Sequence, residues 1–293
     1  MKKFFLSCTC IFLLSELVAG VSWSAEPAEK QPVASISIGA EYATGSYNTG
    51  STTRSVYMPV IINWYPTERF DVSVELPYLY QSSAQVTTTL YQSGAASTAS
   101  QTVARRGGPG GMATTTTASG SAPSSSSTSG SSSVSGLGDI IVRAGYITFF
   151  ENDSLPQLRT SFFVKTPTAS VSDGLGTGEF DFGGGFDLSK WFGDLHLAGE
   201  LLYTRQGNVD GFGLKNYLSY SGTIGYQLTG TLQPMLTVKG ATAPSDYSDD
   251  LLEVRARLLW NFVSTVTLDL FASRGISTSS PDYGAGIAVI YSF

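Results

Sequence analysis

Apolar and polar residues alternate along most of this chain with a period of two. The clearest segment has an apolar face made by Phe70, Val72, Val74, Leu76, Tyr78 and Tyr80. Asp71, Ser73 and Glu75 form its polar face. Because a strand places successive side chains on opposite sides, this alternation predicts β-strands with one apolar and one polar face. The apolar faces end near aromatic residues, which is typical of strands that cross a membrane.

The same pattern predicts twelve strands of about ten residues each. They lie within residues 34–42, 56–64, 70–80, 139–146, 158–165, 179–188, 195–204, 218–226, 232–239, 252–261, 266–273 and 283–293. A pairing of part of residues 81–136 would raise the number to fourteen. The fold class expected is therefore all-β, with about twelve antiparallel strands.

The connections between these segments alternate in length. Residues 66–69, 190–194, 228–230 and 261–264 are tight turns, whereas 43–54, 81–136, 166–178, 206–214, 241–249 and 274–281 are longer. Residues 150–157 should be a short turn by this rule but are of medium length. Short turns at one end and long loops at the other are typical of an outer-membrane β-barrel with both termini in the periplasm. A soluble β-sandwich is the alternative, but it does not require aromatic rims on its apolar faces.

Composition narrows the class of protein further. The 293 residues include 32 Gly and only 14% charged residues. Beyond the N-terminus no run of 18 apolar residues occurs, which excludes membrane-spanning helices. The net charge of −6 argues against nucleic acid as a partner.

Residues 1–24 have the features of a secretory signal peptide. Lys2 and Lys3 precede the apolar residues 4–14, and small residues suited to cleavage follow. Cleavage after Ser24 fits best, with Gly20 and Ala25 as alternatives. Both cysteines, Cys8 and Cys10, lie in this segment, so the mature chain (25–293) contains no cysteine and has a net charge of about −7.

Residues 94–135 differ in kind from the rest of the chain. They are almost entirely Ser, Thr, Ala and Gly, with Arg105 and Arg106 as the only charges. Such a composition buries too little apolar surface to compensate for the entropy lost on ordering. We expect a disordered external loop, either simply tolerated at that length or with a gating or adhesive role.

The chain stops at Phe293, with Tyr291 two residues before it on the same face of the last strand. A last strand that ends in Phe resembles the signal by which the barrel assembly machinery recognises bacterial outer-membrane proteins. We therefore expect Tyr291 and Phe293 to act in assembly.

The polar faces should point into the lumen and carry the function. The charged residues expected there are Glu41, Asp71, Glu75, Arg143, Arg159, Lys165, Asp181, Glu200, Lys215, Lys239, Glu253, Arg255, Arg257 and Asp269. They either select solutes by charge and width or pair with one another and fill the lumen. The candidates for a constriction are Glu253, Arg255, Arg257, Asp269, Glu200, Arg143, Arg159 and Lys165. Arg255 and Arg257 could meet Asp269 or Glu200.

Glycines at 183–185, 284 and 286 remove side-chain bulk from strands that line the barrel. They either keep a passage open or let the wall curve.

Three motifs resemble a known family. Gly136-Leu137-Gly138-Asp139 opens a strand, Lys165-Thr166-Pro167-Thr168 closes the next, and Leu175-Gly176-Thr177-Gly178 precedes the one after. Together with residues 136–293 they are similar to the outer-membrane transporters named for the "MetA-pathway of phenol degradation". The resemblance implies an outer-membrane barrel that passes hydrophobic or aromatic compounds. It implies no particular site residues, and the long Ser/Thr-rich insertion departs from the family's compact loop.

An enzyme is not expected. Some twelve-stranded outer-membrane barrels are lipases, which need Ser and His on the lipid-facing side near the outer rim. His196, the only histidine, should face inward near the periplasmic end. No G-x-S-x-G elbow precedes a helix. No catalytic residue, metal or cofactor is predicted.

The sequence thus predicts a channel or transporter for small molecules in the outer membrane. Its expected partners are the lipid bilayer, the barrel assembly machinery and a small solute. The alternative is a structural or surface-interaction barrel that acts through residues 94–135.

Overall fold

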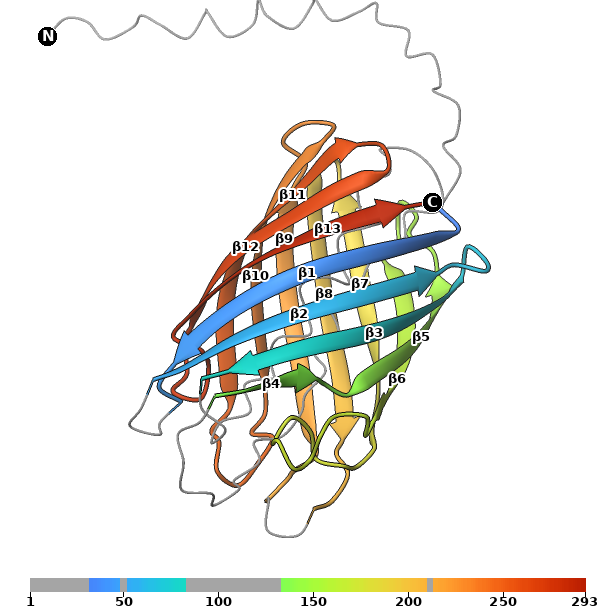
Figure 1. Ribbon diagram of the computed structural model, residues 1–293. Coiled ribbons are helices and arrows are strands. Elements are labelled where there is room, and N and C mark those ends of the chain that lie inside the picture. Colours follow the sequence, from blue (N-terminus) through green and yellow to red (C-terminus); the bar gives the residue numbers. More distant parts are fainter. Residues whose placement is uncertain (1–31, 48–51, 83–132, 210–212) are drawn as a thin grey trace, which may run out of the picture. The chain divides into compact units, whose positions relative to one another are not determined.

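The computed structural model describes residues 32–47, 52–82, 133–209 and 213–293, all within one unit, Pro32–Phe293 (Figure 1). The predicted signal peptide and most of the predicted external loop lie outside these residues. Every regular element of the described chain is a strand. Among the described residues, no helix is long and apolar enough to cross a membrane.

The strands follow one another along the chain as thirteen segments. They are β1 (Ala34–Gly45), β2 (Thr53–Trp64), β3 (Phe70–Gln81), β4 (Val134–Leu137), β5 (Ile140–Phe149), β6 (Gln157–Thr166), β7 (Asp181–Phe192), β8 (Leu195–Arg205), β9 (Tyr217–Tyr226), β10 (Leu232–Ala241), β11 (Leu251–Val263), β12 (Val266–Gly275) and β13 (Tyr283–Ser292). All pair antiparallel within a single sheet.

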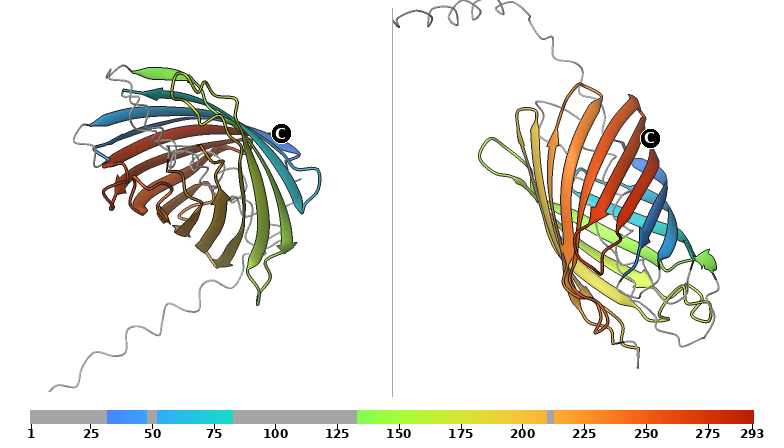
Figure 2. Two further views of the ribbon diagram at one scale, coloured as in Figure 1. Left: turned by 90° about the horizontal axis from the view of Figure 1, so that it is seen from below. Right: turned by 90° about the vertical axis from the view of Figure 1, so that its left-hand side faces the viewer.

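The sheet closes on itself. β1 pairs with β2 on one side and with β13 on the other, where Ser35 lies opposite Ser292 and Thr44 opposite Tyr283. The strands therefore curve around one interior (Figure 2). Closure leaves no edge strand, so the backbone polar groups of the wall are satisfied without water, as a bilayer requires.

Two of the thirteen segments form one crossing. β3 pairs with β5 over Phe70–Glu75 and with β4 over Tyr78–Gln81, so β4 and β5 continue one another around a break at Gly138 and Asp139. The barrel thus has twelve crossings, which confirms the predicted number. β4 also includes Val134 and Ser135, which the sequence predicted to belong to the loop. Their pairing with Gln81 and Tyr80 of β3 lengthens an existing crossing and adds no new pair of strands.

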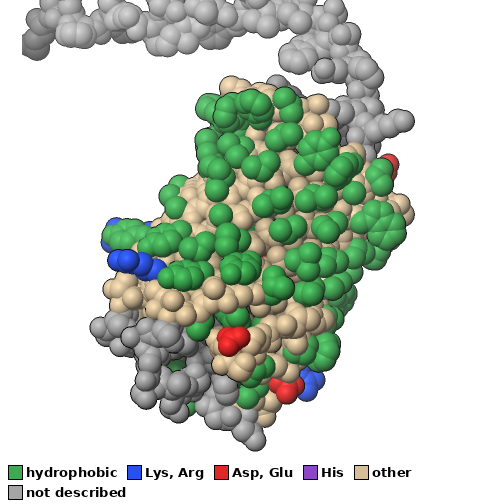
Figure 3. Space-filling view, viewed as in Figure 1, with side chains coloured by type: hydrophobic (Ala, Val, Ile, Leu, Met, Phe, Trp, Pro, Cys, Tyr) green, Lys and Arg blue, Asp and Glu red, His purple; other side chains and the backbone are tan. Residues whose placement is uncertain are grey.

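The predicted alternation of faces is present in the burial of the side chains. In β1, Ser35 and Ser37 are fully buried inside, whereas 60% of the surface of Ile38 is exposed on the outside. On β6, Phe162 is 68% exposed. Figure 3 shows hydrophobic side chains over the outer face of the barrel, with charged groups near its rims. An apolar surface of this extent is typical of contact with lipid.

The connections also follow the predicted alternation. The turns 65–69, 193–194 and 264–265 are short and lie at the end that holds Phe293, at the top of Figure 1. The longer loops lie at the opposite end, which we assign to the cell exterior. The medium-length connection 150–156 is held to β7, where Lys190 donates a hydrogen bond to the carbonyl of Asn152 and the Trp191 amide donates to Glu151 at 2.8 Å.

Candidate functional site: the charged lumen

The residues proposed for a constriction face the interior. Glu253, Arg255 and Arg257 follow one another at alternate positions of β11, as the period of two requires. All eight candidates are buried or partly buried: Glu253, Arg255, Arg257, Asp269, Glu200, Arg143, Arg159 and Lys165. Lys215 differs from the expectation, because it lies in the loop before β9, about half exposed, and pairs with Asp246 at 2.6 Å.

One group of charges lies on β11, β12 and β1. The Nε of Arg255 donates to Glu253 at 2.9 Å, and its guanidinium approaches Glu41 at 3.9 Å. The same guanidinium lies 4.0 Å from the centre of the Phe271 ring, in cation–π geometry. Arg257 makes two hydrogen bonds to Asp269, the partner that the sequence suggested. Both arginines are therefore held by acids on the wall of the barrel.

A second group lies on β3, β5, β6 and β7. Arg143 donates to Glu75 at 2.6 Å, and the hydroxyl of Tyr57 donates to the same carboxylate. Arg159 donates through two nitrogens to Asp71, at 2.9 and 2.6 Å, and through a third to Asp187 at 3.0 Å. Bidentate arginine–carboxylate pairs of this kind are strong and fix the orientation of the side chain.

The position of Arg159 depends on a glycine in the adjacent strand. A Cβ atom at Gly145 would lie only 2.0 Å from the Arg159 guanidinium. The missing side chain thus gives the guanidinium its place against the wall. This dependence runs between strands, and a search for charged residues in the sequence does not reveal it.

Glu200 lies between the two groups. It sits opposite Asp187 in the strand register, and its electrostatic partners include Arg159, Arg143 and Lys239. Its Oε2 atom accepts no hydrogen bond from the described residues, and no described contact joins it to Arg255 or Arg257. A carboxylate oxygen without a donor is therefore available inside the barrel.

The lumen contains more acids than bases among the described residues. The inward acids are Glu41, Asp71, Glu75, Asp139, Asp181, Asp187, Glu200, Glu253 and Asp269. The inward bases are Arg143, Arg159, Lys165, Lys239, Arg255 and Arg257. Nine acidic against six basic side chains give the interior a formal charge of −3 if every group is ionised.

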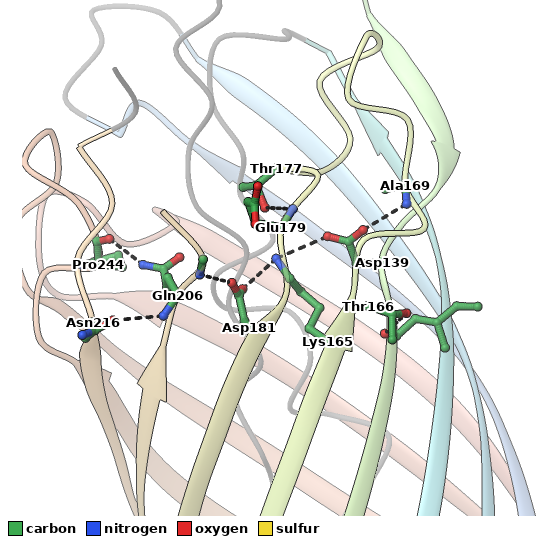
Figure 4. A network of polar contacts seen from close by, with 12 residues as sticks. Asp139, Lys165, Thr166, Ala169, Thr177, Glu179, Asp181, Gln206, Asn216 and Pro244 are labelled. Atoms are coloured by element: carbon green, nitrogen blue, oxygen red, sulfur yellow. Dashed lines mark hydrogen bonds and ion pairs between the residues drawn. The ribbon is translucent and has the colours of Figure 1, made fainter. Parts of the chain in front are cut away.

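A third group of charges lies at the external end. Lys165 extends between two carboxylates, 3.3 Å from Asp139 and 2.7 Å from Asp181 (Figure 4). Asp139 also accepts a hydrogen bond from the Ala169 amide at 3.0 Å, and Asp181 accepts one from Gly207 at 2.9 Å. Lys165 thus links the external ends of β5, β6 and β7, and the two acids in turn bind the loops that follow β6 and β8.

The loop between β6 and β7, residues 167–180, folds into this end of the barrel, and we call it the inner loop. Its Ala169 and Leu175 are buried and pack with Tyr57 and Leu79, which point inward from β2 and β3. A side chain at Gly176 would meet Ala169 at 2.8 Å and the Asp139 carboxylate at 3.0 Å. The inner loop therefore narrows the external entrance.

The three motifs that carried the family resemblance meet at this entrance. Thr168 accepts a hydrogen bond from the Ile140 amide at 2.9 Å, and Thr166 donates one to the Ile140 carbonyl at 3.0 Å. Leu175 lies so close to Gly136 that a Cβ there would be 2.6 Å away. The motifs thus position the inner loop against the broken crossing formed by β4 and β5.

Tyr47 lies at the same end of the barrel, just after β1. Its backbone φ is +46°, in the left-handed region, and its ring lies over Gly45. Burial, together with the nearby Glu253 and Asp282, raises the pKa of its hydroxyl well above the usual range. The hydroxyl is therefore neutral at physiological pH.

The glycines of the lining do not all act as the sequence suggested. Gly183 and Gly286 face inward, but the rings of Phe163 and Phe271 occupy the space that their side chains would fill. Gly184 faces outward beneath Phe162. These glycines accommodate large neighbours, so they do not by themselves widen a passage.

Two further predictions concern the periplasmic end. His196 points inward from the second residue of β8, as expected from the period of two. Tyr291 and Phe293 point outward, with ring centres 4.8 Å apart in an edge-to-face arrangement. The Phe293 amide donates to the Ala34 carbonyl at 2.9 Å, so the end of the chain is held against β1.

The family model described as "Putative MetA-pathway of phenol degradation" matches residues 108–293. Among solved structures, the NanC porin is similar with a TM-score of 0.50 and 11% identity, covering 88% of this chain and 98% of the porin. The KdgM porin has a TM-score of 0.49 and 9% identity, covering 88% and 99% of the two chains. No curated protein matches the sequence significantly. The likeness to NanC concerns the fold, because the identity is low.

Proposed function

Because the chain belongs to the family described as "Putative MetA-pathway of phenol degradation", we propose that it passes small molecules across the outer membrane through its lumen. The family's name favours hydrophobic or aromatic compounds as solutes. The observation that carries the proposal is the separation of the faces: the outer surface is apolar, while the interior holds fifteen charged side chains.

A barrel that needed only to fill its interior could do so with apolar residues at no loss of stability. Buried ion pairs are often no more stabilising than well-packed hydrophobic residues of the same volume. Two groups on the wall, each of which contains charges of both signs, instead suit a narrow passage that water and solutes can enter. One part of the wall would be lined by Glu253, Arg255, Arg257 and Asp269, and the other part by Arg143 and Arg159. Glu200 would lie between these two groups, and Lys165 would lie at the entrance.

The pairing of these charges implies a selective passage rather than a wide one. Arg255 and Arg257 are buried and bound to acids, and the inner loop lies at the entrance. We therefore expect small conductance steps and a preference for cations. Export by the predicted signal peptide and recognition of Tyr291 and Phe293 by the assembly machinery belong to the same proposal, which assigns no catalytic residue.

Conductance of the purified full-length barrel in planar bilayers tests the proposal. We expect discrete current steps and, in a KCl gradient, a reversal potential on the cation-selective side. Swelling of liposomes that contain the barrel, measured with neutral solutes of increasing size, reports solutes that carry no current. A bilayer that stays closed at all voltages, together with liposomes that do not swell, would overturn the proposal.

The paired interior also favours a second candidate, a structural or surface-interaction barrel. In that case residues 94–135 contact the partner and the lumen carries nothing. A variant that lacks residues 94–132, which leaves β4 whole, separates the two candidates. Passage through the lumen should survive this deletion, whereas a surface interaction should be lost.

A further inference from the structure

Four strands bring a group of uncharged side chains together near the periplasmic end of the lumen. Trp191 of β7, His196 of β8, Gly225 of β9 and Met235 of β10 are successive register partners across the four strands, and Gln233 is the next inward residue of β10 on the periplasmic side of Met235. Gly225 is the register partner of both His196 and Met235. The group therefore occupies one continuous stretch of wall.

The polar atoms of this group are buried without partners. His196 is 4% exposed and Gln233 0%, and among the described residues neither imidazole nitrogen and neither amide atom forms a hydrogen bond. Leaving such groups unsatisfied is costly, so they are normally paired with protein, water or ligand. Four unpaired atoms on two neighbouring side chains indicate a place for a hydrogen-bonding guest.

The remaining members supply an apolar surface. The rings of Trp191 and His196 are stacked with centres 4.5 Å apart and planes tilted by 31°. A side chain added at Gly225 would meet the Gln233 amide nitrogen at 3.1 Å and the Met235 side chain at 3.2 Å. Glycine thus lets the Gln233 and Met235 side chains lie close against the wall beside the aromatic pair; indole rings and thioethers both make favourable contacts with aromatic rings.

The charges around the group are distant or already paired. On β11, Arg257 lies directly opposite Met235, but Asp269 binds its guanidinium. On the strands of the group itself, the next inward charges are Asp187 on β7, Glu200 on β8 and Lys239 on β10, two, two and three inward positions away. Each inward position advances about 6.6 Å along a strand, so these charges lie roughly 13 Å or more along their strands. An ion placed here would lose its hydration, and the nearest charge, Arg257, is already bound to an acid.

We propose that Trp191, His196, Gln233 and Met235 form a binding site for a small neutral aromatic solute whose hydroxyl group both donates and accepts hydrogen bonds. A neutral imidazole and a carboxamide each offer one kind of donor and one kind of acceptor, which matches such a hydroxyl. The site deepens the proposed passage function and rests on it, because the solute would reach these residues through the lumen.

His196 is the only histidine of the chain, which makes it a unique reporter. The full-length barrel, purified without a polyhistidine tag and labelled with ¹⁵N-histidine, gives one imidazole signal pair in micelles. We expect phenol to shift this pair saturably. Benzene, which lacks the hydroxyl, and cyclohexanol, which lacks the aromatic ring, should bind several-fold more weakly.

Two variants separate this site from general effects on the lumen. Gln233→Met keeps the length of the side chain but removes its hydrogen bonds, and should weaken phenol binding about three- to tenfold. Thr204→Val is the control, because Thr204 is also buried on β8 with an unpartnered hydroxyl but lies at the external end. It should leave the affinity unchanged.

The proposal is overturned if phenol causes no saturable shift, if benzene or cyclohexanol binds equally well, or if Gln233→Met binds phenol like the wild type. Conductance and swelling of the same preparation test the passage function separately. If the barrel passes solutes but shows no phenol-dependent shift, the passage function stands and the proposed site is wrong. If the barrel binds phenol but passes no solute, the site stands and the passage function is wrong.

Discussion

Replacing Arg159 with methionine removes the guanidinium that holds two carboxylates on the wall of the lumen. Arg159 contacts Asp71 at 2.6 and 2.9 Å and Asp187 at 3.0 Å. The side chains of all three are no more than 12% exposed. Methionine has a similar length and keeps the apolar contacts of the stem, so the substitution mainly removes charge and hydrogen bonds.

The expected size of the effect follows from burial. Breaking a buried ion pair by removing one partner costs about 3–5 kcal/mol, because the remaining charge stays desolvated. Lys215 and Asp246 form a matched pair with the same separation of 2.6 Å, but their side chains are 50% and 61% exposed. Lys215→Met should therefore cost only about 0–1 kcal/mol.

The free energy of unfolding can be measured by urea titration in phospholipid vesicles, followed by the fluorescence of Trp64, Trp191 and Trp260. A chain with Arg159→Met, Asp71→Asn and Asp187→Asn together should regain most of the stability, because no buried charge is then left alone. Equal losses for Arg159→Met and Lys215→Met would refute the reasoning. That result would mean that the lumen is filled with water well enough to screen its charges.

Three other substitutions and one deletion test the lumen, its entrance and assembly. Lys165→Met removes the cation that ties the inner loop to the wall, so liposomes should swell faster; an unchanged rate would show that the inner loop does not narrow the entrance. Gly183→Val places a side chain against the Phe163 ring and should lower the free energy of unfolding by about 1–3 kcal/mol, with recovery on adding Phe163→Ala. Glu253→Gln removes one inward carboxylate and should reduce the preference for K⁺ over Cl⁻, read as a smaller reversal potential in a KCl gradient. Deleting Phe293 should lower the amount of folded barrel in outer-membrane fractions, whereas equal amounts would contradict its role as an assembly signal.

The sequence by itself determined the faces of the barrel. Because a strand has a period of two, the residues that face lipid and those that face the lumen could be read directly, and β11 places Glu253, Arg255 and Arg257 inward as predicted. The same alternation predicted the number of crossings, the lengths of the connections indicated an outer-membrane barrel, and three short motifs pointed to the family.

Only the tertiary structure decided which residues meet. The period of a strand carries no information about register or about contacts between distant strands, so the pairing of Arg159 with Asp71 and Asp187 could not be predicted. The same holds for the glycines, whose role depends on the neighbour across the sheet: Phe163 fills the space at Gly183. The family motifs, which lie far apart in the sequence, form one entrance because closure of the barrel and the fold of the inner loop bring them together.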